Sequence, residues 1–308
     1  MRAPLRLALA LAGLGRGVEA AMRVAVTGAG GQTGGHVFRK MLARPDVFDP
    51  IGITRSQFSK EALVASTKCD PEQVAIIDVA SVPGLYLEMA VAAFAGCTAL
   101  VICTSAKVKP TGGTNAETGR PNMGFPDGQP YHVDWLGQRR QIDGARGSGM
   151  SHVVLCSSMG GTDKDHMLNS LGRSAKGGGG ILHWKRKAEK YLIDSGLTYT
   201  IVHPGGLLNE PGGRRKLVVG VDDKLLPEQN RSIPREDVAE VLVQSLLNPA
   251  FKNRSFDLVS EPDSGAPVES DFAKLLAPLE GATCDYSLGY IPDEAADISE
   301  ADSLMSLL

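Results

Sequence analysis

The sequence of 308 residues lacks paired cysteines, an excess of either charge and any long apolar run. Its five cysteines are odd in number and never form a CxxC pair, which predicts free thiols in a reducing intracellular compartment and no zinc site. Lysine and arginine (32) nearly balance aspartate and glutamate (35), so the net charge is only −3. The basic surface that is typical of nucleic-acid binding is therefore not expected.

The composition is that of a globular protein with a sizeable core. Hydrophobic residues make up 43% of the chain, charged residues make up 22%, and the mean hydropathy is close to zero. These values exclude a disordered or fibrous chain. The length fits either two average domains or one large doubly wound domain.

Residues 1–21 form a segment that we exclude from the fold. Arg2 and Arg6 precede an apolar run over residues 7–14, which is too short for the roughly 20 residues of a membrane span. An integral membrane segment is therefore not expected. The segment is either a targeting peptide for the chloroplast or another organelle, or an extension that precedes a true start at Met22 in a cytoplasmic protein.

Short apolar strands alternate with helical stretches from Met22 onward. The expected strands are residues 23–27, 51–54, 74–77, 99–104, 152–156, 199–202 and 256–259. Helical apolar spacing occupies residues 34–44, 83–96, 132–147, 181–195 and 234–247. This alternation predicts repeated βαβ units, and therefore an α/β fold with a mostly parallel sheet.

A glycine-rich segment lies directly between the first strand and the first helix. Gly28 permits a tight turn, Gly31 lets the backbone approach a pyrophosphate, and Gly34 allows the helix to pack closely on the strand. The free N–H groups of the helix N-terminus then face the phosphates. The alternative is a glycine-rich turn without a ligand. The residues expected to bind a dinucleotide here are Gly28, Gly30, Gly31, Gln32, Thr33 and Gly34.

The residues after the second and third strands indicate which dinucleotide is bound. NAD-binding proteins usually carry an acid after the second strand, whereas Arg55 and Ser56 follow here. Arg55 can pair with a 2′-phosphate, which favours NADP; the alternative is a solvated surface arginine. After the third strand, Asp78 can accept from the adenine amino group and Val79 can pack on the ring, or Asp78 can simply form a turn.

Several motifs in order resemble those of the atypical short-chain dehydrogenase/reductases, and more narrowly their NAD(P)-binding, NmrA-like group. The motifs are TGAGGQTG, TRS, IIDV, ICTSA, LCSSMGG, HWKRKAEKYL and YTIVHPGGLL. The resemblance implies a Rossmann-type, doubly wound parallel sheet over residues 22–260, followed by a small C-terminal lobe and tail over residues 261–308. It also implies the following site residues: Thr104 and Ser105 at the nicotinamide ribose, Ser158 at the end of strand five, Lys185 as the family lysine, and Pro204, Gly205, Gly206 and Leu207 over the nicotinamide.

The chain departs from the family pattern at the catalytic tyrosine. Catalytic members place Tyr four residues before the lysine, but Ile181 stands four residues before Lys185. A hydrocarbon side chain cannot donate the proton that carbonyl reduction needs. Ser158 is the first candidate to replace it, and His183 and the pair Tyr131-His132 are weaker ones.

Two long segments are candidates for the substrate side of the site. Residues 106–130 are rich in proline, glycine and polar residues, and they form either a lid or a disordered loop. In residues 159–180, the sequence Asp163-Lys164-Asp165-His166 lacks further ligands, which favours a turn over a metal site.

These features predict an NADP(H)-dependent oxidoreductase with Ser158 and Lys185 as its catalytic residues and an unidentified small carbonyl or quinone substrate. The alternative is a protein that senses NADP(H) or acts as a scaffold without catalysis. The sequence does not indicate the oligomeric state.

Overall fold

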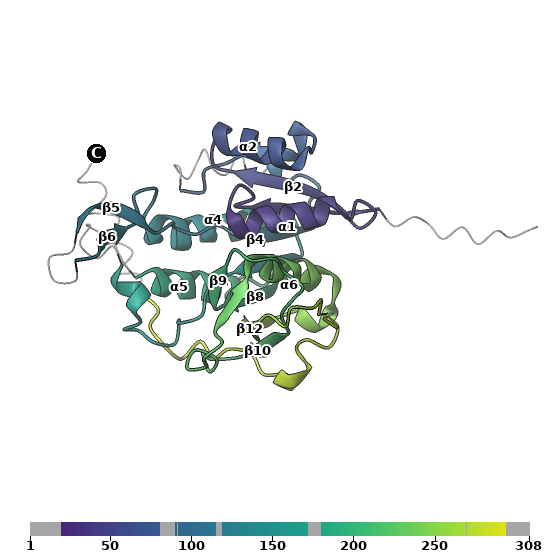
Figure 1. Ribbon diagram of the computed structural model, residues 1–308. Coiled ribbons are helices and arrows are strands. Elements are labelled where there is room, and N and C mark those ends of the chain that lie inside the picture. The colour runs from purple at the N-terminus through teal and green to yellow at the C-terminus, as the bar shows by residue number, and fades with distance from the viewer. Residues whose placement is uncertain are drawn as a thin grey trace, which may run out of the picture.

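A central sheet of eight strands organises the molecule (Figure 1). The computed structural model describes residues 20–80, 90, 92–114, 119–171, 180–268 and 270–293. The strand order is β10-β12-β8-β7-β4-β1-β2-β3. The strands are β1 (Met22–Thr27), β2 (Phe48–Thr54), β3 (Val74–Ile76), β4 (Ala99–Ile102), β7 (His152–Cys156), β8 (Thr198–Pro204), β10 (Leu217–Gly220) and β12 (Arg254–Ser260).

All neighbouring strands in this sheet are parallel except β10, which runs antiparallel to β12 at the edge. The chain winds outward from β1 in both directions, so the strand order reverses between β1 and β4. Ligands of open α/β sheets bind at such a switch point, beyond the carboxyl ends of the strands. The predicted Rossmann-type parallel sheet is confirmed.

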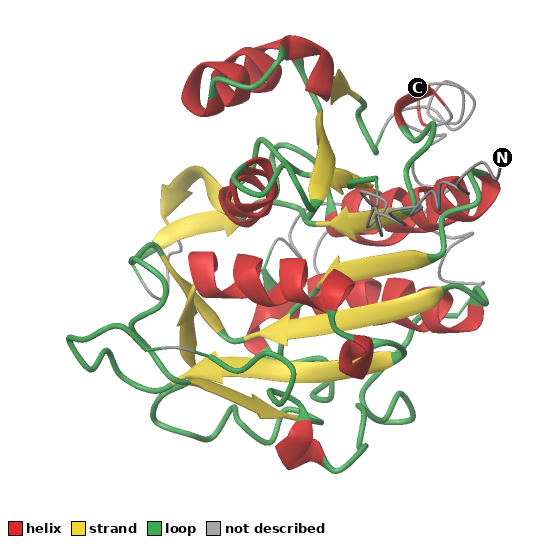
Figure 2. Cartoon of the chain, turned by 90° about the vertical axis from the view of Figure 1, so that its right-hand side faces the viewer, coloured by secondary structure: helices red, strands yellow, loops and turns green. Residues whose placement is uncertain are grey.

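Helices cover both faces of the sheet (Figure 2). Buried side chains of α1 (Gln32–Leu42), α2 (Gln57–Thr67) and α6 (Arg235–Leu247) belong to one core cluster. Side chains of α4 (Gln138–Gly147) and α5 (Ile181–Asp194) belong to the core cluster on the other face. Strands buried on both sides explain the continuous apolar runs in the sequence, such as residues 24–26, which are fully buried in β1.

The helices differ from the sequence-based expectation in three places. The helix α2 was not expected, because only Leu63 of its residues is buried and its apolar periodicity is weak. The helix expected over 132–147 begins with a π-helical turn, η2 (Tyr131–Gly137), before α4. Most of the helix expected over 83–96 lies outside the described residues.

Two small ribbons flank the carboxyl edge of the main sheet. β9 (Gly206–Leu208) pairs in parallel with β11 (Ser232–Pro234). β5 (Lys109–Thr114) and β6 (Pro121–Gly124) form an antiparallel hairpin within the segment 106–130. That segment was expected to be either a lid or a disordered loop, and its described residues are folded.

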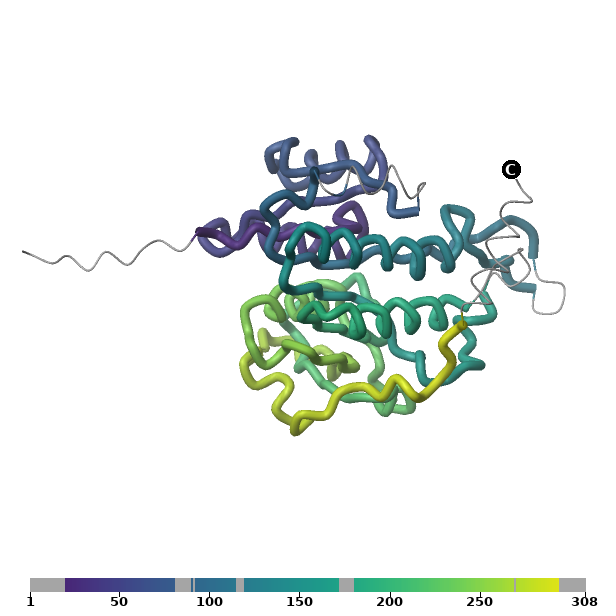
Figure 3. The backbone as a smooth tube through the Cα atoms, turned by 180° about the vertical axis from the view of Figure 1, so that it is seen from behind, coloured from purple at the N-terminus to yellow at the C-terminus, as the bar shows by residue number. Residues whose placement is uncertain are grey.

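The described part of residues 261–293 packs along the Rossmann domain. Figure 3 shows its yellow trace running beside the green part of the chain. Arg186 Nε donates to the Leu288 carbonyl (2.9 Å), and Cys284 N donates to the Ser255 carbonyl (3.1 Å). Among the described residues, no helix is long and apolar enough to cross a membrane.

Candidate nucleotide-binding site

The glycine-rich loop joins β1 to α1 and forces its backbone close to the next strand. Gly28 has a φ of +70°, and a Cβ there would lie 2.7 Å from the Cys103 carbonyl oxygen. A Cβ on Gly34 would lie 2.3 Å from the Gly28 carbonyl oxygen, so only glycine lets α1 pack this closely on the turn. The cap residue of α1, Gly31, provides no side-chain acceptor, and the first turn holds no acid. The first N–H groups of α1 are thus available to an anion.

A cavity of about 810 Å³, counting its open mouth, lies beside this loop at the carboxyl ends of β1, β2, β3 and β4. Of the residues predicted to bind the cofactor, the following line the cavity: Gly28, Gly30, Gly31, Arg55, Asp78, Val79, Thr104 and Ser105.

Arg55 borders the cavity and contacts the segment that follows β6. Its Nη1 donates to the Asp127 carbonyl oxygen (3.1 Å), and its Nη2 lies 3.6 Å from Asp127 Oδ2. The same carboxylate pairs with Lys109 Nζ at 2.5 Å. The hydrogen bond from Lys109, aided by the charge of Arg55, lowers the pKa of Asp127. The described residues of the segment 106–130 therefore close one side of the cavity next to Arg55, the side chain expected to bind the 2′-phosphate.

Asp78 and Thr104 line the cavity and are also held by local hydrogen bonds. Asp78 Oδ1 accepts from Ala80 N (3.0 Å), which is the turn considered as the alternative to adenine binding. Thr104 Oγ1 accepts from Gln141 Nε2 (3.0 Å), and the Thr104 carbonyl accepts from Gln138 Nε2 (3.0 Å). These bonds fix the backbone of the chain beyond β4, where the nicotinamide ribose is expected.

Lys185 lies on α5 in a buried ion pair with Asp134 of η2. Its Nζ is 2.8 Å from Asp134 Oδ1, and Asp134 Oδ2 accepts from Ala106 N (3.0 Å). Lys185 does not line the cavity. One turn earlier on α5, Ile181 packs in an apolar cluster with Ala106 and Phe125 of the segment 106–130.

Ser158 lies beyond β7 and does not line the nucleotide cavity. Its Oγ donates to the Met159 carbonyl (3.0 Å), and the residue lines a second, smaller cavity with Glu189 and His203. The neighbouring Ser157 donates to the carboxylate of Glu189. The structure thus brings the predicted catalytic residues Ser158 and Lys185 to different surroundings.

The other predicted cofactor residues lie outside the cavity lining, namely Gln32, Thr33, Gly34, Lys185, Pro204, Gly205, Gly206 and Leu207. Gln32 Nε2 faces Asn209 Oδ1 at 3.5 Å. A Cβ on Gly205 would lie 2.2 Å from the Arg231 carbonyl oxygen, so this glycine is required by packing whatever binds beside it.

The weaker candidates for a proton donor have structural partners. His183 Nε2 lies 2.9 Å from the Lys164 carbonyl, and Tyr131 is buried with its ring edge on Trp184. In the sequence 163–166, Asp163 Oδ1 accepts from Asp165 N (2.9 Å), which forms the turn expected there.

The sequence analysis missed Asp134, Gln138 and Gln141, which support Lys185 and Thr104. All three are buried on one face of the continuous helix η2-α4. Their spacing of four and three residues places them on that face together with apolar side chains. Polar residues at apolar positions of a helix are the signal that could have found them.

Comparisons with known proteins agree with this geometry. A family model described as NAD(P)H-binding matches residues 28–249. The chain is 43% identical over 257 residues to an uncharacterized chloroplastic protein of Arabidopsis thaliana, which covers 82% of this chain and 74% of that protein. It is 41% identical over 275 residues to sanguinarine reductase of Eschscholzia californica, which covers 83% of this chain and 95% of that protein.

A solved structure shares the fold at low sequence identity. It is a short-chain dehydrogenase/reductase from Veillonella parvula in complex with NADP, with a TM-score of 0.53 and 16% identity, covering 81% of this chain and 99% of that one. The family match spans the glycine-rich loop, the cavity and the sheet edge described above. The chain therefore belongs to the NAD(P)H-binding family of Rossmann-fold proteins, as its resemblance to the atypical short-chain dehydrogenase/reductases implies.

Proposed function

We propose that the protein is an NADP(H)-dependent reductase of a small carbonyl or quinone substrate. The observation that carries the proposal is the end of β2 at the cavity, where Thr54 is followed in the chain by Arg55 and Ser56 and not by an acid. An acid there would bind the ribose 2′-hydroxyl of NAD and repel a 2′-phosphate. A guanidinium at the same place attracts the phosphate through charge-assisted hydrogen bonds.

The glycine-rich loop fits a dinucleotide. Close backbone contacts leave no room for a side chain at Gly28 or Gly34, and Gly31, the cap residue of α1, lines the cavity and provides no side-chain acceptor. When bound, the cofactor would supply a hydride from its nicotinamide. Thr104 and Ser105 would lie at the nicotinamide ribose, and Lys185 would hold the ribose hydroxyls after exchanging its contact with Asp134.

The absence of a tyrosine restricts the substrate. Ile181 and its neighbours Ala106 and Phe125 form an apolar surface in which no side chain donates a proton. General acids typically contribute about 10²- to 10⁴-fold to such reactions, so simple ketones should be reduced slowly. Quinones accept a hydride more readily and should be reduced fastest. Ser158 would donate to the substrate only when its hydroxyl leaves the Met159 carbonyl.

The test is NADPH oxidation by the purified full chain with ketones, aldehydes, quinones and sanguinarine, the last because a 41% identical relative is named as its reductase. We expect turnover with quinones or sanguinarine and little with ketones. Ser158→Ala should lower that turnover about tenfold or more, whereas Ser170→Ala, a change in an exposed serine, should not. Rapid reduction of simple ketones by the unmodified chain would contradict the proposal.

A second function is favoured by one observation. Lys185 is buried against Asp134, and Ile181 replaces the family tyrosine, so neither side chain is ready for catalysis. A protein that binds NADP(H) to sense it or to assemble with partners would need neither. Tight NADPH binding without oxidation by any acceptor in the panel would support this function and exclude the reductase.

We also propose that residues 1–21 direct the protein to a plastid. Support comes from the arginines before a short apolar run and from the 43% identical relative that is described as chloroplastic. A fluorescent protein that carries residues 1–21 at its N-terminus should enter plastids in plant cells. A fluorescent protein fused to residues 22–308 should stay outside them. Identical distribution of the two fusions would contradict the proposal.

A further inference from the structure

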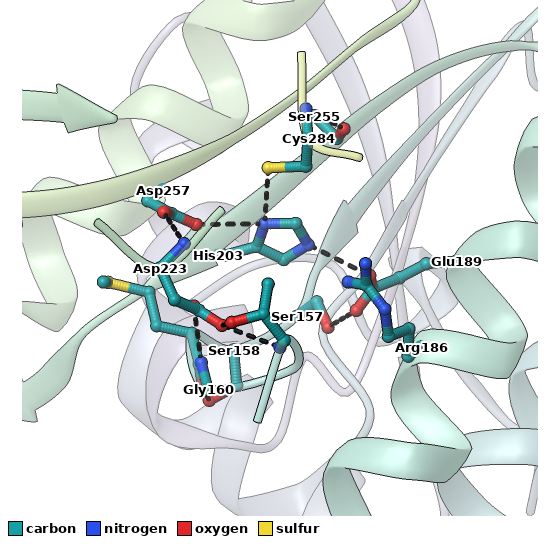
Figure 4. Close-up of polar contacts among 12 residues, drawn as sticks. Ser157, Ser158, Gly160, Arg186, Glu189, His203, Asp223, Ser255, Asp257 and Cys284 are labelled. Carbon is teal, nitrogen blue, oxygen red and sulfur yellow. Dashed lines mark hydrogen bonds and ion pairs between the residues drawn. The ribbon is translucent and has the colours of Figure 1, made fainter. Parts of the chain in front are cut away.

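A buried cluster of three different metal-ligating side chains lies at the carboxyl edge of the sheet, apart from the nucleotide cavity. His203 lies on β8, Asp257 lies beside it in the register of β12, and Cys284 comes from the C-terminal segment (Figure 4). All three side chains are more than nine-tenths buried, at 4%, 1% and 7% exposure. Their ligand atoms lie within 4.8 Å of one another.

We propose that His203, Asp257 and Cys284 form a binding site for one divalent transition-metal ion, with zinc as the expected ion. The site would use His203 Nδ1, Asp257 Oδ1 and Cys284 Sγ, a set of nitrogen, oxygen and sulfur that suits zinc. The sequence predicts no zinc site because its cysteines never form a CxxC pair. Here three segments that are distant in sequence supply one ligand each.

The two distances from His203 Nδ1 fit a tetrahedral ion. Asp257 Oδ1 lies 3.4 Å and Cys284 Sγ lies 3.6 Å from His203 Nδ1. A zinc ion at its usual bond lengths, about 2.0–2.2 Å to nitrogen and oxygen and about 2.3 Å to sulfur, gives edges of about 3.4 and about 3.6 Å. The ligands can therefore bind an ion with little movement of the backbone.

Other contacts hold the three ligands in place. His203 Nε2 lies 3.0 Å from Glu189 Oε2, a contact that holds the imidazole ring while Nδ1 faces Asp257 and Cys284, and zinc would replace any proton on Nδ1. Asp257 Oδ2 accepts from Asp223 N (2.7 Å), which leaves Oδ1 for the ion. Carboxylates that bond the distal nitrogen of a ligating histidine are typical of protein metal sites.

The nearby acids are occupied by other donors. Asp223 accepts from Gly160 N (2.7 Å) and from Thr162 N (2.8 Å), and Asp222 Oδ1 accepts from Asp285 N (2.7 Å). Among the described residues at this site, these two acids are therefore held by backbone donors, whereas His203 Nδ1, Asp257 Oδ1 and Cys284 Sγ face one another. The small cavity that adjoins them is also lined by Ser158, Thr162 and Arg186, and a water molecule there would be the fourth ligand. The guanidinium of Arg186 is held by the Leu288 and Asp285 carbonyls.

The bound ion would join the C-terminal segment to two strands of the sheet. Cys284 is otherwise attached through its backbone to Ser255, whereas His203 and Asp257 belong to β8 and β12. Metal binding to the folded chain alone stabilises it by mass action. Zinc should therefore raise the melting temperature, and removing it with a chelator should lower it.

The experiment is zinc binding by the full chain after dialysis against EDTA, with metal content measured after gel filtration. We expect one zinc ion per chain, a loss of at least tenfold in affinity for Cys284→Ser and Asp257→Asn, and unchanged binding for the buried control Cys97→Ser. Zinc that is not retained by the unmodified chain, or that binds Cys284→Ser equally well, would overturn the proposal.

A second measurement needs no variant and covers the case in which Cys284→Ser fails to fold. Cobalt(II) added to the unmodified chain should produce a thiolate-to-metal charge-transfer band, and an equal amount of zinc should abolish it. No charge-transfer band would show that the cluster is only a hydrogen-bonded network.

Discussion

Lys185 and Asp134 form an ion pair of 2.8 Å in which their side chains are 7% and 0% exposed. Removing one member of such a pair leaves an unpaired buried charge. Any role of Lys185 in cofactor binding is therefore coupled to the stability of the fold, and single substitutions of Lys185 mix the two effects.

The first prediction separates these effects with a double-mutant cycle. Lys185→Met and Asp134→Leu should each lower the free energy of unfolding by about 3–5 kcal/mol, and the double variant should recover most of it. NADPH affinity should stay low in the double variant because the lysine is absent. Urea unfolding and calorimetry measure the two quantities. Additive losses of stability would show that the pair is not coupled.

Asp127 provides the second prediction, because it competes with a 2′-phosphate for Arg55. Asp127→Asn should raise the affinity for NADPH about two- to fivefold and leave that for NADH unchanged. The control is Asp271→Asn, which breaks a surface pair with Lys274 away from the cavity. Weaker NADPH binding by Asp127→Asn would mean that Asp127 helps to form the phosphate site.

The third prediction contrasts two glycines of the loop. A Cβ on Gly31 approaches only the Gly28 carbonyl oxygen, at 3.0 Å, so Gly31→Val should keep the fold and lose nucleotide binding at least tenfold. Gly34→Ala places its Cβ 2.3 Å from the same oxygen and should destabilise the fold by about 1–3 kcal/mol. Circular dichroism and NADPH titration separate the outcomes. Unchanged affinity in a folded Gly31→Val variant would show that the loop is not at the pyrophosphate.

The fourth prediction concerns pH. His152 is buried at the start of β7, where its Nε2 lies 3.0 Å from Thr200 Oγ1. Burial, aided by the charge of Lys252, lowers the pKa of His152 from 6.5 to about 4. The unfolded chain then binds more protons than the folded chain between these values, so this contribution to stability is complete above pH 6.5 and is lost as the pH falls toward 4.

The free energy of unfolding should fall by up to about 3 kcal/mol, because lowering a pKa by one corresponds to about 1.4 kcal/mol. His152→Gln keeps a donor for Thr200 and removes the titration. Its free energy of unfolding should therefore fall less than that of the unmodified chain between pH 6.5 and 4. Equal slopes in urea unfolding at several pH values would rule out this role of His152.

The regular part of the fold could be predicted because its physical cause is local. Strands buried on both faces carry continuous apolar runs, and the glycines of the loop have a fixed spacing. The helix α2 was not predicted for the same reason, since Leu63 is its one buried residue and Phe58 is largely exposed.

The parts of the site that could not be predicted depend on which segments become neighbours. Asp134 meets Lys185 because η2 packs on α5, and Asp257 meets His203 because β12 pairs with β8 in that register. Neither relation is encoded in spacing along the chain. Contacts between distant segments require the strand order and register, which only the folded structure supplies.

The most direct test of the account is calorimetric titration of the unmodified chain and of Arg55→Ala with NADPH and with NADH. A charge-assisted bond between Arg55 and the 2′-phosphate is worth roughly 1.5–3 kcal/mol, or about 10- to 150-fold in affinity. The account predicts that NADPH binds at least tenfold more tightly than NADH and that Arg55→Ala removes most of the difference. Equal affinities of the unmodified chain for the two nucleotides would contradict it.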